Sequence, residues 1–169
     1  MSLCLVANWK LNGSKEFNHQ WALEFLRNFN GNNFSILGIA PASLYIDHLK
    51  TILTDYDIEI GSQNIDLEET GARTGEISAS MIKDLGCAFS IIGHSERRML
   101  FHETNQMICQ KLIQADNNSV IPILCIGESA EENQSNNTFN VLEQQIIEAL
   151  ENANELNSLI IAYEPVWAI

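Results

Sequence analysis

Three residues of different chemistry, Lys10, His94 and Glu164, stand just after apolar runs of the chain. A lysine supplies positive charge, a neutral imidazole can donate a hydrogen bond, and a carboxylate can accept a proton. Together these groups suit the removal of a proton from a carbon beside a carbonyl, with stabilisation of the enediolate oxygen. Lys10 also suits a second chemistry, because a desolvated lysine amine can form a Schiff base with a carbonyl substrate.

Each of these three residues also has an ordinary structural interpretation. A lone lysine such as Lys10 is most often solvated, and His94 taken alone fits a hydrogen-bonded buried side chain as well as a functional one. Glu164 could pair with a surface lysine, although its place after an apolar run favours partial removal from water. The convergence of all three residue types is therefore more informative than any one of them.

Six apolar runs predict strands, and they are rich in Ile, Leu and Val without regular alternation with polar residues. Such runs are typical of strands buried on both faces. They cover residues 3–8, 35–40, 58–63, 88–93, 120–127 and 159–164. Apolar residues spaced three or four apart predict helices around 17–29, 108–115 and 142–150, with Ser14 and Thr104 as N-caps. Gly86 is expected to stop a helix over 78–85, and residues 133–138 are expected to form a solvated loop.

Strands that alternate with helices indicate a parallel sheet with right-handed crossovers. Two architectures fit this pattern, an open doubly wound sheet and a (β/α)₈ barrel, and both place their sites beyond the carboxyl ends of the strands. The first turn, NWKLNG, contains no glycine-rich phosphate motif, so nucleotide binding is poorly supported. The polar residues expected at the common rim are Asn8, Lys10, Gln63, Asn64, His94, Ser95, Glu96, Cys125, Glu128 and Glu164.

Composition narrows the class of protein. The chain has 169 residues, which fits one domain, and its net charge of −13 argues against a nucleic-acid partner. No apolar run approaches the roughly 18 residues of a membrane span, and the run over residues 3–7 is too short for a signal peptide, so we expect a cytoplasmic protein. No metal site is expected, because catalytic zinc usually needs three protein ligands and no His-x-x-His pair occurs. The widely spaced cysteines predict reduced, buried thiols at Cys4, Cys87, Cys109 and Cys125.

Five segments resemble the signature segments of the triosephosphate isomerase family, in that family's order and spacing. They are NWKLNG (Asn8 to Gly13), GARTGEIS (Gly71 to Ser78), IIGHSERR (Ile91 to Arg98), CIGE (Cys125 to Glu128) and AYEPVWAI (Ala162 to Ile169). The resemblance covers the whole chain. It implies an α/β fold of the (β/α)₈ TIM-barrel type, as a single domain over residues 1–169 that covers about the first six strand–helix units.

The resemblance implies a cytoplasmic isomerase of glycolysis and gluconeogenesis that interconverts D-glyceraldehyde 3-phosphate and dihydroxyacetone phosphate without a cofactor. Glu164 would be the base that moves a proton between adjacent carbons. His94, held neutral, would donate a hydrogen bond to the substrate oxygen. Lys10 would supply charge for the enediolate and the phosphate, and Asn8 would position the substrate oxygen.

Further roles are implied around these catalytic groups. Ser95, Glu96 and Cys125 would support the catalytic side chains from behind, and Glu128 would anchor Trp167 by a hydrogen bond. A stiff lid hinge would be formed by Pro165, Val166 and Trp167. In this arrangement the movement of the lid is coupled to the placement of the base.

The stretch from Asn64 to Glu76 is long for a connection between a strand and a helix, which usually has about 2–6 residues. Its ordinary interpretation is a flexible surface loop. The resemblance implies instead that the loop inserts into a second subunit through Thr74, Gly75 and Glu76, which predicts a homodimer. Arg97 or Arg98 would then also lie in the interface.

Other expectations follow from departures and absences. Ala7, Leu11 and His102 differ from the residues common in the family, but they stand beside the expected site rather than in it. Because six of eight strands cannot close a barrel, we expect residues 1–169 to belong to a longer polypeptide and to be inactive and aggregation-prone alone. Two hypotheses compete with the isomerase: a Schiff-base lyase built on Lys10, and a barrel piece with a binding or structural role.

Overall fold

The computed structural model describes residues 3–29, 34–153 and 155–169. Six strands form one parallel sheet in which each strand pairs with its neighbours in sequence order. They are β1 (Cys4–Asn8), β2 (Ile36–Ala40), β3 (Glu59–Ser62), β4 (Phe89–Ile92), β5 (Ile121–Ile126) and β6 (Ile160–Tyr163). Each predicted apolar run therefore contains one strand, and the parallel alternation of strands and helices is confirmed.

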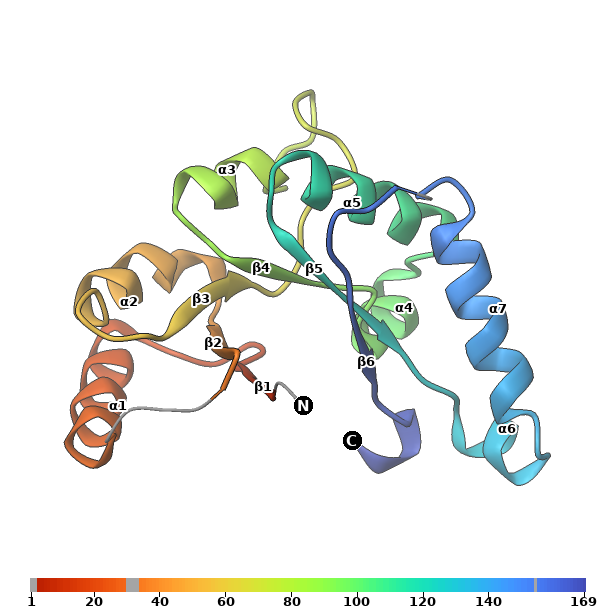
Figure 1. Ribbon diagram of the computed structural model, residues 1–169, viewed down its shortest axis with the longest axis horizontal. Coiled ribbons are helices and arrows are strands. Elements are labelled where there is room, and N and C mark those ends of the chain that lie inside the picture. Colours follow the sequence, from red (N-terminus) through yellow and green to blue (C-terminus); the bar gives the residue numbers. More distant parts are fainter. Residues whose placement is uncertain (1–2, 30–33, 154) are drawn as a thin grey trace.

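The sheet curves into an open arc with helices along its outer side, while β1 and β6 stand at its two ends (Figure 1). The α-helices are α1 (Lys15–Asn28), α2 (Ile46–Ile52), α3 (Ala79–Asp84), α4 (Ser95–Phe101), α5 (Asn105–Asn117), α6 (Ala130–Gln134) and α7 (Thr138–Leu150). The described residues also form two short 3₁₀ helices, η1 (Ser43–Tyr45) and η2 (Val166–Ala168). Within the described ranges, none of the helices combines the length and the apolar character needed to cross a membrane.

Helix ends follow the expected local chemistry. Ser14 accepts a hydrogen bond from the backbone N–H of Phe17, and Thr104 accepts one from Met107, so both predicted N-caps are confirmed. Gly86 lies two residues past the end of α3 with φ 72°, the left-handed conformation that stops a helix at little cost.

The predicted loop over residues 133–138 is wrong at both ends. Asn133 lies inside α6 and Thr138 begins α7. At the first of these ends the reason is a capping box, in which Ser129 and Glu132 each accept a hydrogen bond from the other's backbone N–H and so start α6 without apolar periodicity. The cysteine expectation also needs one correction: three thiols are buried, but Cys4 is exposed.

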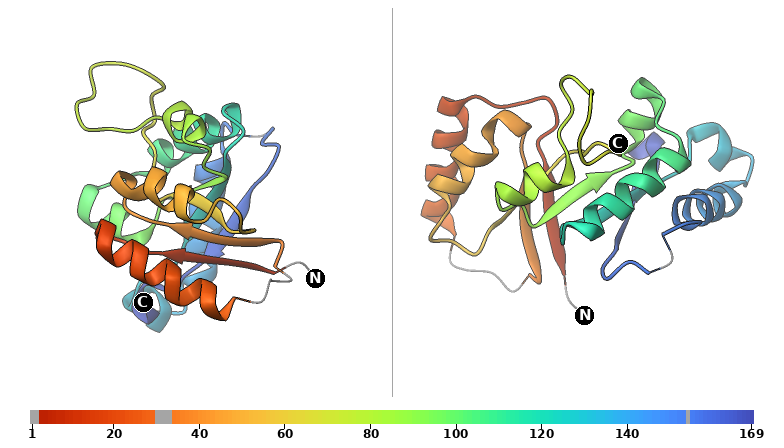
Figure 2. Two further views of the ribbon diagram at one scale, coloured as in Figure 1. Left: turned by 90° about the vertical axis from the view of Figure 1, so that its left-hand side faces the viewer. Right: turned by 90° about the horizontal axis from the view of Figure 1, so that it is seen from above.

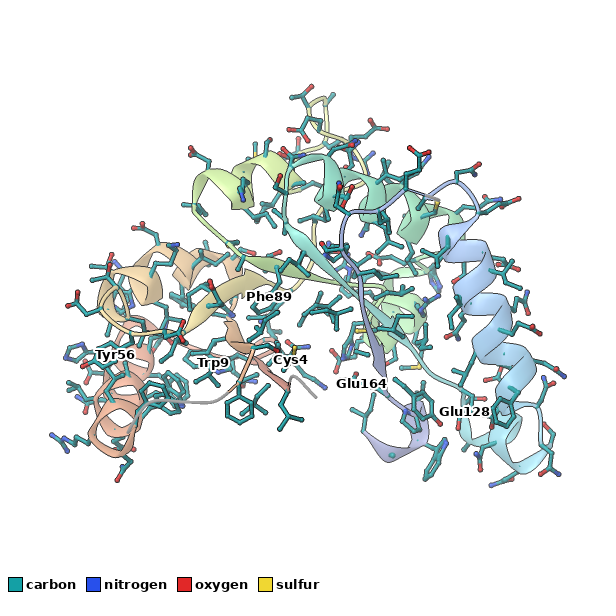
Figure 3. The ribbon with its side chains drawn as sticks, viewed as in Figure 1. Cys4, Trp9, Tyr56, Phe89, Glu128 and Glu164 are labelled. Carbon is teal, nitrogen blue, oxygen red and sulfur yellow. The ribbon has the colours of Figure 1, made fainter. Side chains whose placement is uncertain are left out.

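A small apolar cluster fills the concave side of the sheet, whereas the larger core lies between the sheet and its helices. The ring of Phe89 occupies the centre of the concave cluster (Figure 3). It rests against β2 and β3 where Gly38 and Gly61 stand, and a Cβ atom at Gly38 would lie 2.6 Å from the ring. Glycine at these two positions leaves the space that the ring fills.

Candidate active site

The predicted site residues meet at the carboxyl ends of the strands. Asn8 ends β1, His94 follows β4 after one residue, and Glu164 directly follows β6. A cavity of about 340 Å³ on the concave side is lined by these three residues together with Cys125. The rim predicted from the apolar runs is therefore a single place in the fold.

His94 and Glu164 face each other. The Nε2 atom of His94 lies 3.4 Å from Oε2 of Glu164, with 7% of the histidine side chain and 45% of the glutamate side chain exposed. The other ring nitrogen, Nδ1, accepts a hydrogen bond from the backbone N–H of Glu96 at 3.2 Å, because His94 is itself the N-cap of α4. A neutral ring in this position carries its proton on Nε2, which directs the donor toward Glu164 and the cavity.

Lys10 reaches the rim from the loop after β1. Its ammonium donates to Oε1 of Glu96 at 2.8 Å, and both side chains are more than a third exposed. The hydrogen bond from Lys10 is the main cause that lowers the pKa of Glu96, and the charge of Lys10 adds to it against the effect of burial. The pair holds the lysine beside His94 while leaving its ammonium accessible.

The backbone of Lys10 adopts φ 52°, a left-handed conformation that is uncommon for a residue with a side chain. Two polar side chains fix it. Asn8 accepts a hydrogen bond from the Lys10 backbone N–H, and the Gln63 amide donates to the carbonyls of Lys10 and Ala40, each at 2.9 Å. The sequence places Gln63 at the rim, but the carbonyls it binds are set by the packing of three strands.

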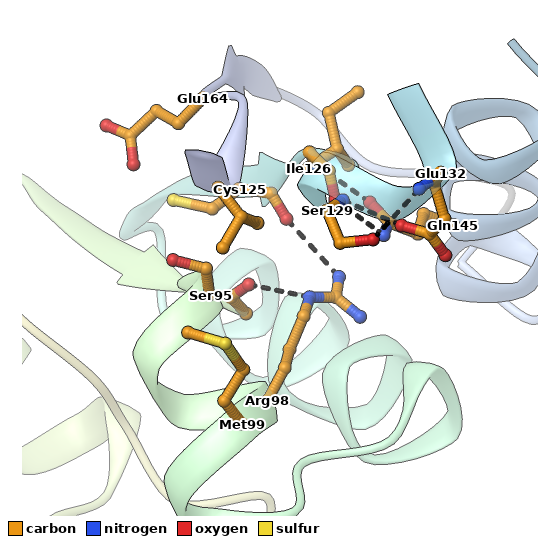
Figure 4. Close-up of a pocket in the computed structure, with 12 residues that line it drawn as sticks. Ser95, Arg98, Met99, Cys125, Ile126, Ser129, Glu132, Gln145 and Glu164 are labelled. Atoms are coloured by element: carbon orange, nitrogen blue, oxygen red, sulfur yellow. Dashed lines mark hydrogen bonds between the residues drawn. The ribbon is translucent and has the colours of Figure 1, made fainter. Parts of the chain in front are cut away.

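Cys125 lies at the end of β5 and is buried. Burial and, next, the charge of Glu164 raise the pKa of its thiol to about 12. The thiol is therefore protonated at neutral pH and is not a nucleophile. With Ser95, it lines a second cavity of about 180 Å³ that Glu164 also borders (Figure 4).

Glu128 is fully buried and ties the end of the chain to β5. It accepts hydrogen bonds from the Trp167 indole at 3.0 Å and from the Tyr163 hydroxyl at 3.1 Å. These bonds, led by that of Trp167, lower the pKa of Glu128 although burial acts in the opposite direction. The hydrogen bond expected between Glu128 and Trp167 is present, and Tyr163 is a partner that the sequence did not indicate.

The segment expected to form the hinge lies directly against this anchor. The Val166 backbone N–H donates to the carbonyl of Glu128, and the Glu164 backbone N–H donates to the carbonyl of Ile126. Pro165 separates the two bonds and precedes η2. The backbone on both sides of the proline is thus held by the end of β5.

The loop between β3 and α3 projects away from the body of the molecule (Figure 2). Its base is closed by a backbone bond from Asp66 to Ile77, and Arg73 forms an ion pair with Asp66. The three residues expected to insert into a second subunit are exposed; they are Thr74, Gly75 and Glu76. Among the two arginines expected at the same interface, the Arg98 guanidinium turns inward, and Arg97 pairs with Glu103.

A carboxylate and a ring N–H face each other across one edge of the cavity, with an ammonium beside the ring. This arrangement can move a proton and stabilise an oxyanion without covalent attachment. Among the residues that the structure describes, no group of His, Cys, Asp and Glu side chains is placed to hold a metal ion. The fold and the site define the class of barrel enzymes that transfer protons at the carboxyl ends of parallel strands.

Comparison with known proteins agrees with this class. A family model described as triosephosphate isomerase matches residues 3–169. The chain is 40% identical over 167 residues to the triosephosphate isomerase of Nitrosococcus oceani, covering 98% of this chain and 67% of that protein. It is 45% identical over 174 residues to that of Blochmanniella floridana, covering 99% of this chain and 66% of that protein. The chain belongs to the triosephosphate isomerase family.

A solved structure supports the same conclusion. The crystal structure of triosephosphate isomerase from Bartonella henselae superposes with a TM-score of 0.87 at 33% sequence identity, covering 99% of this chain and 69% of that one. The predicted family and the TIM-barrel fold class are confirmed, with this chain covering about six strand–helix units of such a barrel. The chain spans about two thirds of the length of the curated relatives it matches.

Proposed function

We propose that this protein is an isomerase that interconverts D-glyceraldehyde 3-phosphate and dihydroxyacetone phosphate. The observation that carries the proposal is the approach of His94 Nε2 to within 3.4 Å of Glu164 Oε2, with Nδ1 engaged by the backbone of α4. The imidazole donor and the carboxylate base therefore border the same space. Membership of the triosephosphate isomerase family supports the choice of a triose phosphate as substrate.

In the proposed reaction the Glu164 carboxylate removes a proton from the carbon beside the substrate carbonyl. The Nε2–H of His94 donates to the oxygen on which negative charge develops, so the enediolate forms without full charge separation. The protonated Glu164 then returns the proton to the neighbouring carbon. No redox change and no external reactant are needed, because one proton moves between the adjacent carbons, a second moves from the substrate hydroxyl to the former carbonyl oxygen, and the bonding electrons stay within the substrate.

Lys10 and Asn8 complete the proposed site. The Lys10 ammonium is paired with Glu96, and an arriving phosphate or oxyanion offers it a second negative partner. The Asn8 amide lines the same cavity and orients a substrate oxygen. Substrate can therefore reach the Lys10 ammonium by a rearrangement of the exposed Lys10–Glu96 ion pair. No buried charge has to be exposed for this step.

We further propose that Pro165, Val166 and Trp167 form the hinge of a lid whose closure positions Glu164. The buried Glu128 supports this, because it binds Trp167 while its carbonyl binds the backbone of Val166. The protein is also proposed to be a cytoplasmic homodimer assembled through the loop over Asn64–Glu76. The projection of that loop, with Thr74 exposed, supports this assembly.

A Schiff-base lyase built on Lys10 is less well supported. The Lys10 ammonium donates to Glu96, and a protonated amine is not a nucleophile. Borohydride trapping in the presence of substrate separates the two hypotheses. The isomerase leaves no adduct on Lys10, whereas a lyase of this kind is trapped as a secondary amine.

The proposal is tested by turnover of glyceraldehyde 3-phosphate by the protein expressed from its own reading frame. Glu164→Gln keeps the shape of the side chain but removes the base, so the turnover number falls by about 10²–10⁴-fold while the unfolding curve is unchanged. Glu24→Gln, an exposed substitution on α1, is the matched control and keeps full activity. Wild-type turnover by Glu164→Gln would show that another group is the base.

A further inference from the structure

Arg98, in the middle of α4, directs its guanidinium inward instead of toward solvent. Its Nε atom donates to the carbonyl of Gly93 at 2.8 Å, and Nη2 donates to the carbonyl of Cys125 at 3.2 Å. Figure 4 shows both bonds, with the side chain standing between the end of β4 and the end of β5. One planar cation thus binds a backbone carbonyl at the end of each of two neighbouring strands.

A second layer of contacts keeps the guanidinium in this orientation. The Nη1 atom of Arg98 donates to Oδ1 of Asn105 at 2.5 Å, and the amide nitrogen of Asn105 donates to Glu148 on α7 at 2.8 Å. Arg98 is partly buried, and this desolvation lowers the pKa of its guanidinium. A lysine could not replace it, because a single ammonium lacks the planar fork that reaches both carbonyls.

The two carbonyls lie next to the backbone of the proposed catalytic pair. Gly93 directly precedes His94 and turns the chain with φ 71°, the left-handed conformation that sends the histidine toward the cavity. On the other side, Cys125 is followed by Ile126, whose carbonyl accepts the hydrogen bond from the Glu164 backbone N–H at 2.9 Å. Arg98 therefore joins the peptide before His94 to β5, whose last residue accepts the hydrogen bond from the Glu164 backbone.

We propose that Arg98 is a positioning residue for proton transfer, which sets the separation of His94 and Glu164 by clamping the carbonyls of Gly93 and Cys125. Its effect on catalysis rests on the function proposed above, but its effect on the geometry of His94 does not. Arg98 touches no reacting atom. It acts by holding the start of α4, where His94 is the N-cap, at a fixed position relative to β5.

The test uses Arg98→Lys and Arg98→Ala, with Arg27→Lys on the exposed last turn of α1 as the matched control. Urea unfolding first shows whether each variant is folded. For the folded variants, two quantities are measured: the steady-state constants and the ¹⁵N signals of the His94 imidazole. In Arg98→Lys we expect the turnover number to fall by about 10–100-fold with KM close to wild type, as a misplacement near 1 Å would cause. The ¹⁵N signals should move away from those of a ring protonated on Nε2 with Nδ1 accepting a bond.

Guanidinium rescue distinguishes positioning from a purely structural role. Millimolar guanidinium added to Arg98→Ala should restore part of the turnover number and the His94 signals, whereas sodium chloride at equal ionic strength should not. If Arg98→Ala fails to fold, Asn105→Ala takes its place, because it keeps the arginine but removes the group that orients it.

The outcomes separate the inference from the proposed function. A folded Arg98→Lys variant with unchanged His94 signals and turnover within about twofold of wild type overturns the inference and leaves the isomerase intact. Displaced His94 signals in a protein whose wild type shows no turnover support the clamp and overturn the proposed function.

Discussion

Two lysine–glutamate pairs of the same chemistry occupy opposite surroundings in this molecule. At the rim, Lys10 and Glu96 lie 2.8 Å apart with side chains 36% and 41% exposed. Beneath it, Lys111 of α5 and Glu103 lie 2.5 Å apart with side chains 4% and 2% exposed. The first pair borders the cavity, whereas the second lies inside the protein.

The difference in exposure suits the Lys10–Glu96 pair to binding a substrate and the Lys111–Glu103 pair to stabilising the fold. An exposed pair typically contributes about 0–1 kcal/mol, so Lys10 can change partner when an anion arrives without loss of the fold. The buried Lys111 has fixed partners, since it also donates to Asn64 at 2.8 Å. Asn64 follows Gln63, whose amide holds the Lys10 carbonyl, so the buried pair supports the backbone beneath the exposed one.

The largest expected effect comes from breaking the buried pair. In Lys111→Met, Glu103 keeps only one cationic partner, the half-buried Arg97. The Oε2 atom of Glu103 already has no hydrogen-bond partner in the described part of the chain. Because Glu103 then keeps only one of its two cationic partners, the free energy of unfolding in urea should fall, by up to the roughly 3–5 kcal/mol typical of a broken buried pair.

The double variant Lys111→Met/Glu103→Leu is the control for this prediction. It removes both charges and should recover most of the loss, since an apolar pair can replace a buried ion pair at little cost. A single Lys111→Met variant that loses less than about 1 kcal/mol would show that the two pairs do not differ in the way described.

The corresponding change at the rim should affect catalysis instead of the fold. Lys10→Met removes the charge that we propose stabilises the developing oxyanion, so kcat/KM for the triose phosphate should fall by about 10²–10³-fold. Its free energy of unfolding should stay within about 1 kcal/mol of wild type. Parallel turnover and urea measurements check both statements, and a large loss of stability with little loss of activity would reverse the comparison.

The smallest effect concerns pH. The folded protein lowers the pKa of Glu96, chiefly through the hydrogen bond from Lys10, below the ordinary value of about 4.3. The contribution of Glu96 to stability is therefore fully present above its ordinary pKa, and it is lost as the pH falls through the lowered value. A ¹³C NMR titration of the carboxyl should show this, and Lys10→Met should raise the midpoint. Identical midpoints in both proteins would exclude Lys10 as the cause.

The strands and the main site residues were predictable because their signals are local. Strands buried on both faces give unbroken apolar runs, and parallel strands bring their carboxyl ends together, which placed His94 and Glu164 at one rim. Apolar residues spaced three or four apart predicted α1, α5 and α7. The short α6 escaped prediction because its start depends on the reciprocal bonds of Ser129 and Glu132 instead of on a core-facing stripe.

Contacts made across the fold could not be predicted in the same way. Lys111 interrupts an apolar helical pattern, a signal that a buried charge needs a partner, but nothing local identifies that partner as Glu103. The double contact of Gln63 depends on the register of β1, β2 and β3, and the inward turn of Arg98 depends on where β5 ends. Such groups become visible only when strands distant in sequence are placed side by side.

The packing of the Phe89 ring against Gly38 and Gly61 limits which substitutions can accumulate at these three positions during evolution. A side chain at either glycine would collide with the ring, while removal of the ring first would leave a cavity costing about 3–5 kcal/mol. Every single step away from this trio is thus penalised, although a coordinated replacement could fill the same volume. Positions 38, 61 and 89 are expected to be inherited as one unit, with any lineage that enlarges a glycine having shortened the aromatic residue in the same episode of change.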